Sequence, residues 1–507
     1  MWKPLLRSAA FLAVISAAVV SASVQVTLIS DIHLDPNYGT PAAYSSCTTP
    51  ESSVWGVAGC EASPQLTQRS LDDVSEQNTS FIFHGGDWQR HRFYGSGLSA
   101  TSIFGDLSER FRNVTVDGSL GEVAFCTALG NNDVVPNYFF ALDSSMSEQE
   151  LFQRVQAMET VGLLTSSEAG VMAKCGYYTH EMATVNVIVL HTLLWTFRLR
   201  PELSDSISDP CNQFAFLESE LQKVRSSGKR AIILGHIPPG LNTFNVLRGG
   251  FNTLERDIFW KPEYQRSYDA IIYAYRDVVT VQIYGHTHRF TLQVFPENGV
   301  LSLIMPAISP IYNNNPSYLL ANFSERDWSL QDVQIRYVTQ DGMFHAGMSA
   351  KRALKISADL SSLPQLRASI KALATDDEAW ENYLRMFCGG ELRNTVFPRG
   401  PCDARCRYVV VCSMLESNHS HIQRCVADFL ATSSDDSTHM SSGAMALIII
   451  CSIIGLDMSV MLVLMARSGQ TTLACSNFQS TKWWRSLLEK QSKSSVATGA
   501  TELHAVM

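Results

Sequence analysis

The sequence has no excess of basic residues. Its 39 Lys and Arg are outnumbered by 48 Asp and Glu, which gives a formal net charge of −9 at pH 7. Proteins that bind nucleic acids in general are normally basic, because Lys and Arg neutralise the phosphates. We therefore expect no nucleic-acid partner. The hydrophobic share of 46% is ample for a core, in about two to four domains or in one large domain with appendages.

The chain also lacks an N-terminal hydrophobic run long enough to span a membrane. Lys3 and Arg7 precede a short apolar run from Ala9 to Val20, and small residues follow at 21–23. This layout is typical of a secretory signal peptide, whereas a transmembrane helix needs about 20 apolar residues. We predict that residues 1–23 are a signal peptide, with a buried N-terminal helix as the alternative.

A second apolar run, at residues 444–465, is long enough to cross a bilayer. Asp435 and Asp436 lie before it and Arg467 lies after it, and a positive flank indicates the cytosolic side. We predict a Ser- and Thr-rich stalk at 431–443, one transmembrane helix at 444–465 and a cytosolic tail at 466–507. The long tail argues against a lipid-anchor signal. Asp457 inside the run faces a partner helix or stays protonated.

The cysteines and glycosylation motifs agree with this type I topology. Two of the 12 cysteines, Cys451 and Cys475, fall in the predicted span and tail. The others allow up to five disulfides in an oxidising compartment, and their pairing is open except that Cys47 and Cys60 are expected to close one loop. The four Asn-x-Ser/Thr motifs all precede the span, at Asn78, Asn113, Asn322 and Asn418. We therefore predict a glycoprotein of the secretory pathway, with its main domain in a vacuole-like or lysosomal lumen or at the cell surface.

Polar residues follow five apolar segments, at the point where each predicted strand ends. The segments are Val24–Ser30, 80–86, 122–130, 231–235 and 281–285. The first leads to Asp31 and His33, and the second leads to Asp87 and His91. The third leads to Asn131 and Asn132, the fourth to His236, and the fifth to His286 and His288. Helical spacing separates some of them, as at Phe214–Ser226. Alternating strands and helices predict an α/β layered fold, whose binding site lies at the carboxyl ends of the strands.

The side chains at these strand ends form a set suited to metal ions. They are two carboxylates, four imidazoles and one amide, namely Asp31, Asp87, His33, His236, His286, His288 and Asn131. Nitrogen and oxygen ligands without thiolate suit Zn, Mn or Fe, and this number serves two divalent ions that share one carboxylate. Two such ions activate water and clamp a phosphoryl group. His84 and His191 also lie near strand ends, but the sequence favours structural roles for both.

The polar strand-end pattern stops after about residue 338. Lys351–Asp359 and Asp376–Cys388 have helical patterns, and a cysteine-dense segment follows with Cys402, Cys406, Cys412 and Cys425. We predict a catalytic domain at 24–338 and a helical, cysteine-rich subdomain at 339–430.

The motifs Asp-x-His, Gly-Gly-Asp, Gly-Asn-Asn-Asp, Gly-His-Ile-Pro-Pro and Gly-His-Thr-His, in this order, resemble the calcineurin-like metallophosphoesterases. The Pro-Pro form and the C-terminal cysteines are similar to the acid sphingomyelinase-like branch, in its shorter members without a saposin-like segment. The resemblance implies a β-sandwich flanked by helices and the pairs Cys402–Cys406 and Cys412–Cys425. It also implies two ions, zinc by analogy. One would be held by Asp31, His33, Asp87 and His288, and the other by Asp87, Asn131, His236 and His286.

One position departs from that branch. Asn132 stands where its members have a histidine that protonates the leaving oxygen, and an amide has no such proton to give. Gly-Asn-Asn-Asp is instead similar to endopolyphosphatases, whose leaving group needs less acid. His91 matches a second active-site histidine of the branch and is the other candidate acid.

These features predict hydrolysis of a phosphorylated substrate without a covalent intermediate. The lipid head group of sphingomyelin-like lipids or a nucleotide diester is the first candidate substrate, and inorganic polyphosphate, held by the basic run Arg90-His91-Arg92, is the alternative. A catalytically weak surface receptor that keeps structural metals is a second alternative. The oligomeric state is open.

Overall fold

The computed structural model describes residues 23–44, 47–49, 53–94, 96–116, 123–142, 144–393, 397–398 and 400–438. No helix within these ranges is long and apolar enough to cross a membrane. The predicted span at 444–465 and cytosolic tail lie outside the described residues, as does nearly all of the predicted signal peptide. The predicted stalk begins as helix, because α13 (His419–Thr438) extends into it.

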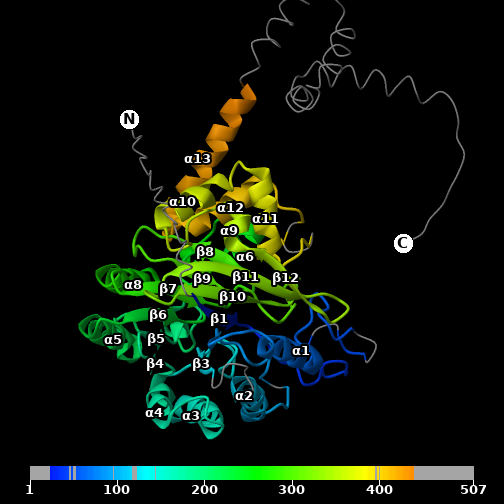
Figure 1. The fold of residues 1–507 in the computed structure, drawn as a ribbon, viewed down its shortest axis with the longest axis vertical. Helices are drawn as coiled ribbons and strands as arrows, with labels where there is room; N and C mark the ends of the chain where they lie inside the picture. Colours follow the sequence, from blue (N-terminus) through cyan, green and yellow to red (C-terminus); the bar gives the residue numbers. More distant parts are fainter. Residues whose placement is uncertain are drawn as a thin grey trace, which may run out of the picture. The chain divides into compact units, whose positions relative to one another are not determined.

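Two six-stranded sheets form the centre of the fold (Figure 1). The first has the order β12-β11-β10-β1-β2-β3. Its strands are β1 (Ser23–Ile29), β2 (Phe81–His84), β3 (Ala124–Thr127), β10 (Ser317–Ser324), β11 (Leu330–Val338) and β12 (Phe344–Ser349). β1, β2 and β3 run parallel, and the remaining pairs are antiparallel. Since β12 pairs with β11, the sheet continues past residue 338, where the catalytic domain was predicted to end.

The second sheet has the order β4-β5-β6-β7-β9-β8. Its strands are β4 (Tyr178–Glu181), β5 (Val185–Val189), β6 (Arg230–Leu234), β7 (Val279–Tyr284), β8 (Thr291–Gln293) and β9 (Ser302–Ile304). β5, β6, β7 and β9 are parallel. The strands predicted before Asp31, Asp87, Asn131, His236 and His286 are all present. Their near-continuous apolar sequence fits parallel strands that are covered on both faces, and β5 is buried throughout.

Helices flank both sheets (Figure 1). They include α1 (Pro64–Ser75), α2 (Ala100–Val116), α3 (Ser145–Thr160), α4 (Ser166–Cys175), α5 (Gln213–Ser227) and α8 (Pro262–Ala274). Local sequence explains where several begin. The Ser63 side chain accepts the Leu66 N–H and Pro64 opens α1, while Thr165 and Glu168 form a capping box at α4. The helix predicted at Phe214–Ser226 is α5.

Shorter helices follow the sheets toward the C-terminus. They are α9 (Ala350–Ala353), α10 (Leu363–Ala372), α11 (Asp377–Phe387) and α12 (Ala404–Leu415). The helix predicted at Asp376–Cys388 is α11, but the one predicted at Lys351–Asp359 is wrong beyond Ala353. Lys355 has a left-handed backbone, with φ 53°, and the N–H of Leu360 bonds to Gln331 of β11. Backbone pairing to the sheet therefore replaces the helix.

Four disulfides tie these elements together. Cys47–Cys60 closes the predicted loop, and Cys402–Cys406 and Cys412–Cys425 are the pairs implied by the resemblance. Cys175–Cys211 joins the end of α4 to the segment before α5. The remaining two described cysteines, Cys126 and Cys388, are free and buried, so a fifth bridge is not formed among the described residues.

Candidate metal centre

All seven predicted ligands meet where the two sheets present the carboxyl ends of their parallel strands. Three strands of the first sheet supply Asp31 and His33, Asp87, and Asn131, while β6 and β7 supply His236, His286 and His288. Hydrogen bonds tie the two edges together. The ring of His236 donates from Nδ1 to the Gly85 carbonyl over 2.7 Å, and the His286 N–H donates to Asp31 Oδ2 over 3.0 Å. The site is thus assembled from both sheets.

Backbone conformations at the site are unusual. Five of the seven residues, Asp31, His33, Asp87, His286 and His288, have φ between 49° and 71°, in the left-handed region that non-glycine residues seldom adopt. Such strain persists only where the surroundings impose it, and it gathers at functional sites.

Two glycines permit the close approach of these loops. A Cβ on Gly285 would lie 2.1 Å from Ser30 Oγ, and one on Gly130 would lie 2.0 Å from Asp87 Oδ1. Any larger residue at either position would push a carboxylate-bearing loop away from the site.

Asp31, His33 and His288 form one cluster. Their ligand atoms all lie within 4.8 Å of one another. His33 Nε2 is 3.1 Å from His288 Nε2 and 3.4 Å from Asp87 Oδ2, and His288 Nε2 is 3.3 Å from Asp31 Oδ1. The other nitrogen of His33 lies 3.1 Å from the Gln89 carbonyl, which can only accept, so Nδ1 carries a proton. In the neutral ring, the Nε2 lone pair therefore faces the cluster.

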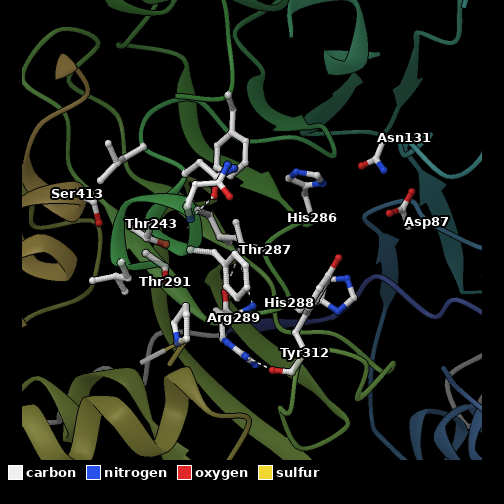
Figure 2. A pocket seen from close by; sticks show the side chains of 18 of the residues that line it. Asp87, Asn131, Thr243, His286, Thr287, His288, Arg289, Thr291, Tyr312 and Ser413 are labelled. Carbon is white, nitrogen blue, oxygen red and sulfur yellow. Dashed lines mark hydrogen bonds between the residues drawn. The ribbon is translucent and has the colours of Figure 1, made fainter. Parts of the chain in front are cut away.

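Asp87, His236 and His286 form the second cluster, with Asn131 beside them. His236 Nε2 lies 3.2 Å from Asp87 Oδ2 and 3.2 Å from Asn131 Oδ1. The Asn131 amide nitrogen donates to Asn137, which turns its oxygen to the site. Figure 2 shows His286 on the side of Asn131 and Asp87, and His288 beside Tyr312. The two histidines of Gly-His-Thr-His therefore serve different clusters, and Asp87 lies between them.

The electrostatics of the site require positive charge. Burial alone lowers the pKa of His33, but the carboxylates of Glu61 and Asp87 outweigh it and raise that pKa to about 10. Burial likewise opposes protonation of His236, and Asp87 and Asp31 still raise its pKa to about 9. Two buried carboxylates thus demand two compensating protons or cations. Converging imidazole, carboxylate and amide donors fit divalent ions in that place.

Asn132 and Asp133 form hydrogen bonds to neighbouring loop residues and are not among the candidate metal ligands. The backbone N–H and the amide Nδ2 of Asn132 both donate to the Asp87 carboxylate over 2.8 Å, which leaves the Asn132 Oδ1 without a partner in the described structure. The buried Asp133 carboxylate accepts N–H groups from Asp87, Trp88 and Gly130, each over 2.8 Å. Burial and the nearby Asp87 charge raise the pKa of Asp133 to about 6.

His91 is paired with a carboxylate that the sequence did not reveal. Its Nδ1 lies 2.6 Å from Glu61 Oε1, and its ring stacks on His33 with centroids 4.3 Å apart. Glu61 Oε2 accepts the Ser309 hydroxyl over 2.7 Å. Burial would raise the pKa of Glu61, but the charges of His91 and His33 lower it to about 2. The His91 Nε2 is left facing the Tyr312 hydroxyl at 3.2 Å, beside the metal cluster.

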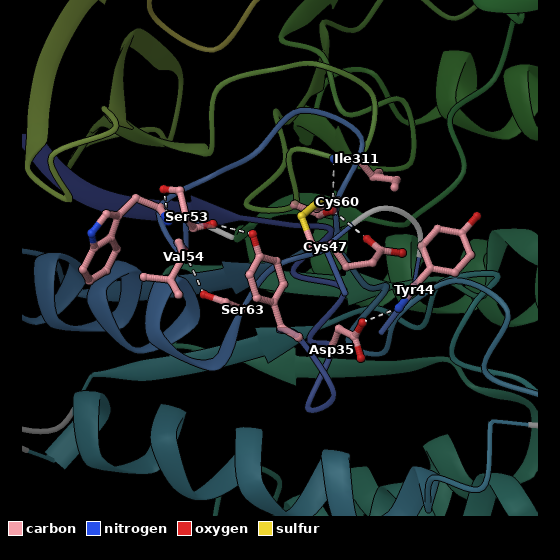
Figure 3. Close-up of a disulfide and its surroundings, with 12 residues drawn as sticks. Asp35, Tyr44, Cys47, Ser53, Val54, Cys60, Ser63 and Ile311 are labelled. Carbon is pink, nitrogen blue, oxygen red and sulfur yellow. Dashed lines mark hydrogen bonds between the residues drawn. A yellow bond between two sulfur atoms is a disulfide. The ribbon is translucent and has the colours of Figure 1, made fainter. Parts of the chain in front are cut away.

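The Cys47–Cys60 disulfide (Figure 3) ends at the residue that directly precedes Glu61 in the sequence. On the far side of Glu61 lies Ser63, which caps α1. No strand-end pattern marks residue 61, because its partner His91 is thirty residues away and only the folded loop brings them together.

The predicted basic run supplies only His91 to the cavity. Arg90 is buried and its Nη1 donates to Asp35 Oδ1 over 3.0 Å and to the Ala42 carbonyl, so its charge is neutralised within the loop. Arg92 is exposed and lies over Tyr44. The prediction that this run holds a polyanion therefore fails for Arg90.

A cavity of about 250 Å³ opens from the centre. Its polar lining includes Asp87, His91, Asn131, Asn132, His286 and His288, and its apolar and aromatic lining includes Phe244, Phe259, Tyr312, Phe387 and Val410. Two arginines that the sequence did not single out, Arg198 and Arg289, also border it. The cavity thus combines candidate metal ligands with several aromatic side chains.

His84 and His191 do not border this cavity. The His84 Nδ1 lies 3.0 Å from Thr127 Oγ1, and the His191 Nδ1 lies 3.0 Å from the Cys175 carbonyl. Burial lowers the pKa of His84 to about 3 and that of His191 to about 4. Both are neutral core residues, as the sequence favoured.

Comparisons with known proteins agree with this geometry. The calcineurin-like phosphoesterase family model matches residues 24–290, which is more than half of the chain. The chain is 24% identical over 294 residues to sphingomyelinase phosphodiesterase D from Dictyostelium discoideum, covering 56% of this chain and 62% of that protein. The match therefore spans less than two thirds of that relative.

Two further similarities come from animals. Human cyclic GMP-AMP phosphodiesterase SMPDL3A is 25% identical over 337 residues, covering 61% of this chain and 69% of that protein. A dimetal phosphatase structure from Danio rerio covers 62% of this chain and 96% of its own, at 11% identity and a TM-score of 0.37, which is too low to add to the argument. The family model matches most of the sheet strands, and the candidate metal ligands gather at the strand ends. The chain therefore belongs to the calcineurin-like phosphoesterases and is a metal-dependent phosphoester hydrolase.

Proposed function

We propose that the protein hydrolyses phosphodiesters, as the names of its sphingomyelinase-like and cyclic GMP-AMP phosphodiesterase relatives suggest. Sphingomyelin-like lipids and nucleotide diesters are the candidate substrates.

In this proposal Asp31, His33, Asp87 and His288 hold one divalent ion, and Asp87, Asn131, His236 and His286 hold the other. Both ions are zinc by analogy. Bound ions of this kind activate water and stabilise the charge on a phosphoryl group during in-line displacement. Asn132 supports the reaction indirectly, because its two N–H donors orient the Asp87 carboxylate that both clusters share.

The observation that carries the proposal is the Glu61–His91 pair. A buried carboxylate 2.6 Å from Nδ1 fixes the orientation of the ring, so that Nε2 is the nitrogen that gives a proton at the cavity. A diester with an alkoxide leaving group needs such a proton. His91 therefore takes the role that Asn132 cannot fill.

Inorganic polyphosphate is the second candidate substrate. The Gly-Asn-Asn-Asp sequence favours it, but the internal ion pair of Arg90 with Asp35 removes one charge that was expected to hold a polyanion. The surface-receptor alternative was based on Asn132, which cannot act as the acid. The Glu61–His91 pair offers another acid and so weakens that alternative.

Leaving-group dependence tests the proposal. His91→Gln should lower kcat about 10²–10⁴-fold on a diester with an alkyl leaving group, because a group that supplies a proton contributes that much. On a p-nitrophenyl diester, whose leaving group needs no proton, the loss should stay within about tenfold. The substrates to compare are sphingomyelin, a dinucleotide and p-nitrophenyl diesters, with polyphosphate alongside.

Asp87→Asn is the reference variant. It removes the carboxylate that both clusters share, so turnover of every substrate and the metal content should fall together. Equal loss on alkyl and p-nitrophenyl diesters in His91→Gln would contradict the acid role. Retention of full turnover and full metal in Asp87→Asn would contradict the two-metal site.

A further inference from the structure

Two arginines border the cavity, and they differ in exposure. Arg289 is buried, its Nη2 donates to the Tyr312 carbonyl, and its Nη1 is shielded from solvent. Arg289 also lies 5.8 Å from the Phe387 ring. It therefore supports the wall, whereas Arg198 is exposed at the mouth of the cavity.

Arg198 lies at the end of the centre formed by Asn131, His236 and His286. The centre of its guanidinium is 5.6 Å from the Tyr138 ring, and that ring is 6.5 Å from the His286 ring. Arg198 forms no ion pair with a carboxylate in the described part of the chain, although many arginines of this protein do, such as Arg90, Arg225 and Arg336. Its side chain hydrogen-bonds to Tyr138, and no described carboxylate neutralises its positive charge at the border of the cavity.

The backbone fixes Arg198 relative to the centre. The Tyr138 N–H donates to the Asn131 carbonyl over 3.0 Å, and the Arg200 N–H donates to the Tyr138 carbonyl over 2.8 Å. On the other side, Phe197 N–H donates to the carbonyl of Phe259, whose ring packs 5.1 Å from His286. Two independent tethers thus link the segment around Arg198 to residues at the metal centre. These bonds hold the backbone on both sides of Arg198, from which its exposed guanidinium extends.

We propose that Arg198, with Asn137 and Tyr138, forms a subsite for a second phosphate of the substrate, next to the phosphate that is cleaved. The proposal rests on the proposed phosphodiesterase function and narrows its substrates. A planar guanidinium binds phosphate through paired, charge-assisted hydrogen bonds. It would repel the quaternary ammonium of a phosphocholine head group. Arg198 therefore favours nucleotides or oligophosphates over zwitterionic lipids.

A matched pair of substrates tests the subsite in the full chain loaded with zinc. Thymidine 5′-(p-nitrophenyl phosphate) and its 3′-phosphorylated form differ only in the second phosphate. ATP, followed by chromatography of its products, offers a second phosphate through an anhydride instead. p-Nitrophenyl phosphorylcholine carries a cation in its place. Comparing the 3′-phosphorylated substrate with ATP distinguishes a second phosphate far from the cleaved one from a second phosphate bonded directly to it.

The variants are Arg198→Gln, Arg198→Lys and the control Arg248→Gln. Arg248 is an exposed arginine of α6 (Thr243–Gly249), whose neighbours border the cavity while Arg248 itself does not. Arg198→Gln should lower kcat/KM about tenfold on at least one substrate with a second phosphate, since one charge-assisted contact is lost. Its kcat/KM on the plain diester should stay within about twofold of wild type. Arg198→Lys should recover part of the loss, and added salt should reduce the difference.

Product binding provides a readout without turnover. By titration calorimetry, thymidine 3′,5′-bisphosphate should bind wild type more tightly than thymidine 5′-monophosphate, and Arg198→Gln should abolish most of that difference. The subsite is overturned if Arg198→Gln lowers all substrates equally, or leaves both the substrate ratios and the binding difference unchanged. Absence of any diester hydrolysis by metal-loaded wild type would instead refute the proposed function, and the calorimetric comparison would still decide on the subsite.

Discussion

Asp133 illustrates how a single buried side chain supports the site without touching it. Its carboxylate gathers three N–H groups from the Gly-Gly-Asp and Gly-Asn-Asn-Asp loops. Because Asp87 belongs to the first loop and Asn131 to the second, the Asp133 carboxylate sets the distance between two candidate metal ligands. Partners of this kind orient ligands and tune affinity for the metal.

We expect Asp133→Asn to weaken both stability and metal retention. An amide nitrogen would face at least one backbone N–H, leaving a buried donor unpaired at a cost of about 1–3 kcal/mol. Metal affinity should fall about 10–100-fold because Asp87 is released. Thermal unfolding and metal content after dialysis measure the two effects.

The control for this experiment is Asp277→Asn. It breaks an ion pair with Arg225 whose partners are largely exposed, and such pairs contribute at most about 1 kcal/mol. An Asp133→Asn protein that keeps wild-type metal content, with stability no lower than that of Asp277→Asn, would show that Asp133 does not support the site.

The loop before α1 links a disulfide, the carboxylate that pairs with His91 and a helix cap. Cys60, Glu61 and Ser63 are nearly consecutive, and they respectively form a disulfide, pair with His91 and cap α1. The Asp35 N–H bonds to Ala62 within the same stretch, which attaches it to the segment after β1. A short loop is thereby fixed at several points, and the carboxylate that orients His91 is fixed with it.

Removing the Cys47–Cys60 disulfide should therefore affect activity as well as stability. The two bridges Cys47–Cys60 and Cys175–Cys211 close loops of 13 and 36 residues, for which loop entropy predicts contributions of about 3 and about 4 kcal/mol. Replacing either pair by alanine should lower the free energy of unfolding. Only the Cys47 and Cys60 variant should also lose turnover preferentially on alkyl diesters, through Glu61 and His91.

The Cys175 and Cys211 variant is the internal control, since this bridge lies at α4 and borders no part of the cavity. Urea unfolding and the two classes of diester provide the measurements. If both double variants show the same ratio of alkyl to p-nitrophenyl activity as wild type, the disulfide has no part in placing His91.

At the scale of the whole chain, the C-terminal helices complete the cavity that the sheets begin. Phe387 of α11 and Val410 and Ser413 of α12 border it. Hydrogen bonds join this region to the sheet, including Val294 N–H to the Met414 carbonyl over 2.8 Å and Arg367 to Val294 and Leu415. The segment predicted as a separate subdomain at 339–430 thus contributes side chains to the lining of the cavity.

We further propose that the protein matures in the secretory pathway. Four disulfides fit an oxidising compartment, and the motif asparagines Asn78, Asn113 and Asn418 are exposed. Treatment of the protein from a eukaryotic host with an N-glycosidase should lower its apparent mass. Asn→Gln changes at these positions should remove the shift stepwise. A mass unaffected by the enzyme would contradict glycosylation and weaken the assignment of the compartment.

The sequence by itself predicted which side chains gather at the strand ends, because its signals are local. Each ligand follows its own apolar strand within a few residues, and parallel strands present their carboxyl ends at one edge, so Asp31 through His288 were predicted without knowing any contact. The short motifs also indicated a metal-binding role for His286 and structural roles for His84 and His191. The strands before Asp31, Asp87, Asn131, His236 and His286 were predicted in the same way. The strands β10, β11 and β12 and the helices α1 to α4 were not predicted, and backbone bonds to β11 replace the predicted helix after Ala353.

Only the tertiary structure decided what surrounds that core. Glu61 reaches His91 across a folded loop, Arg198 reaches the cavity through tethers to Asn131 and Phe259, and Arg90 turns away to Asp35. Glu61 and Arg198 do not follow a predicted strand, and nothing within a few residues of either indicates a partner. Side-chain pairing across long sequence separations depends on how loops pack, so the roles proposed for His91 and Arg198 in substrate choice rest on the tertiary structure.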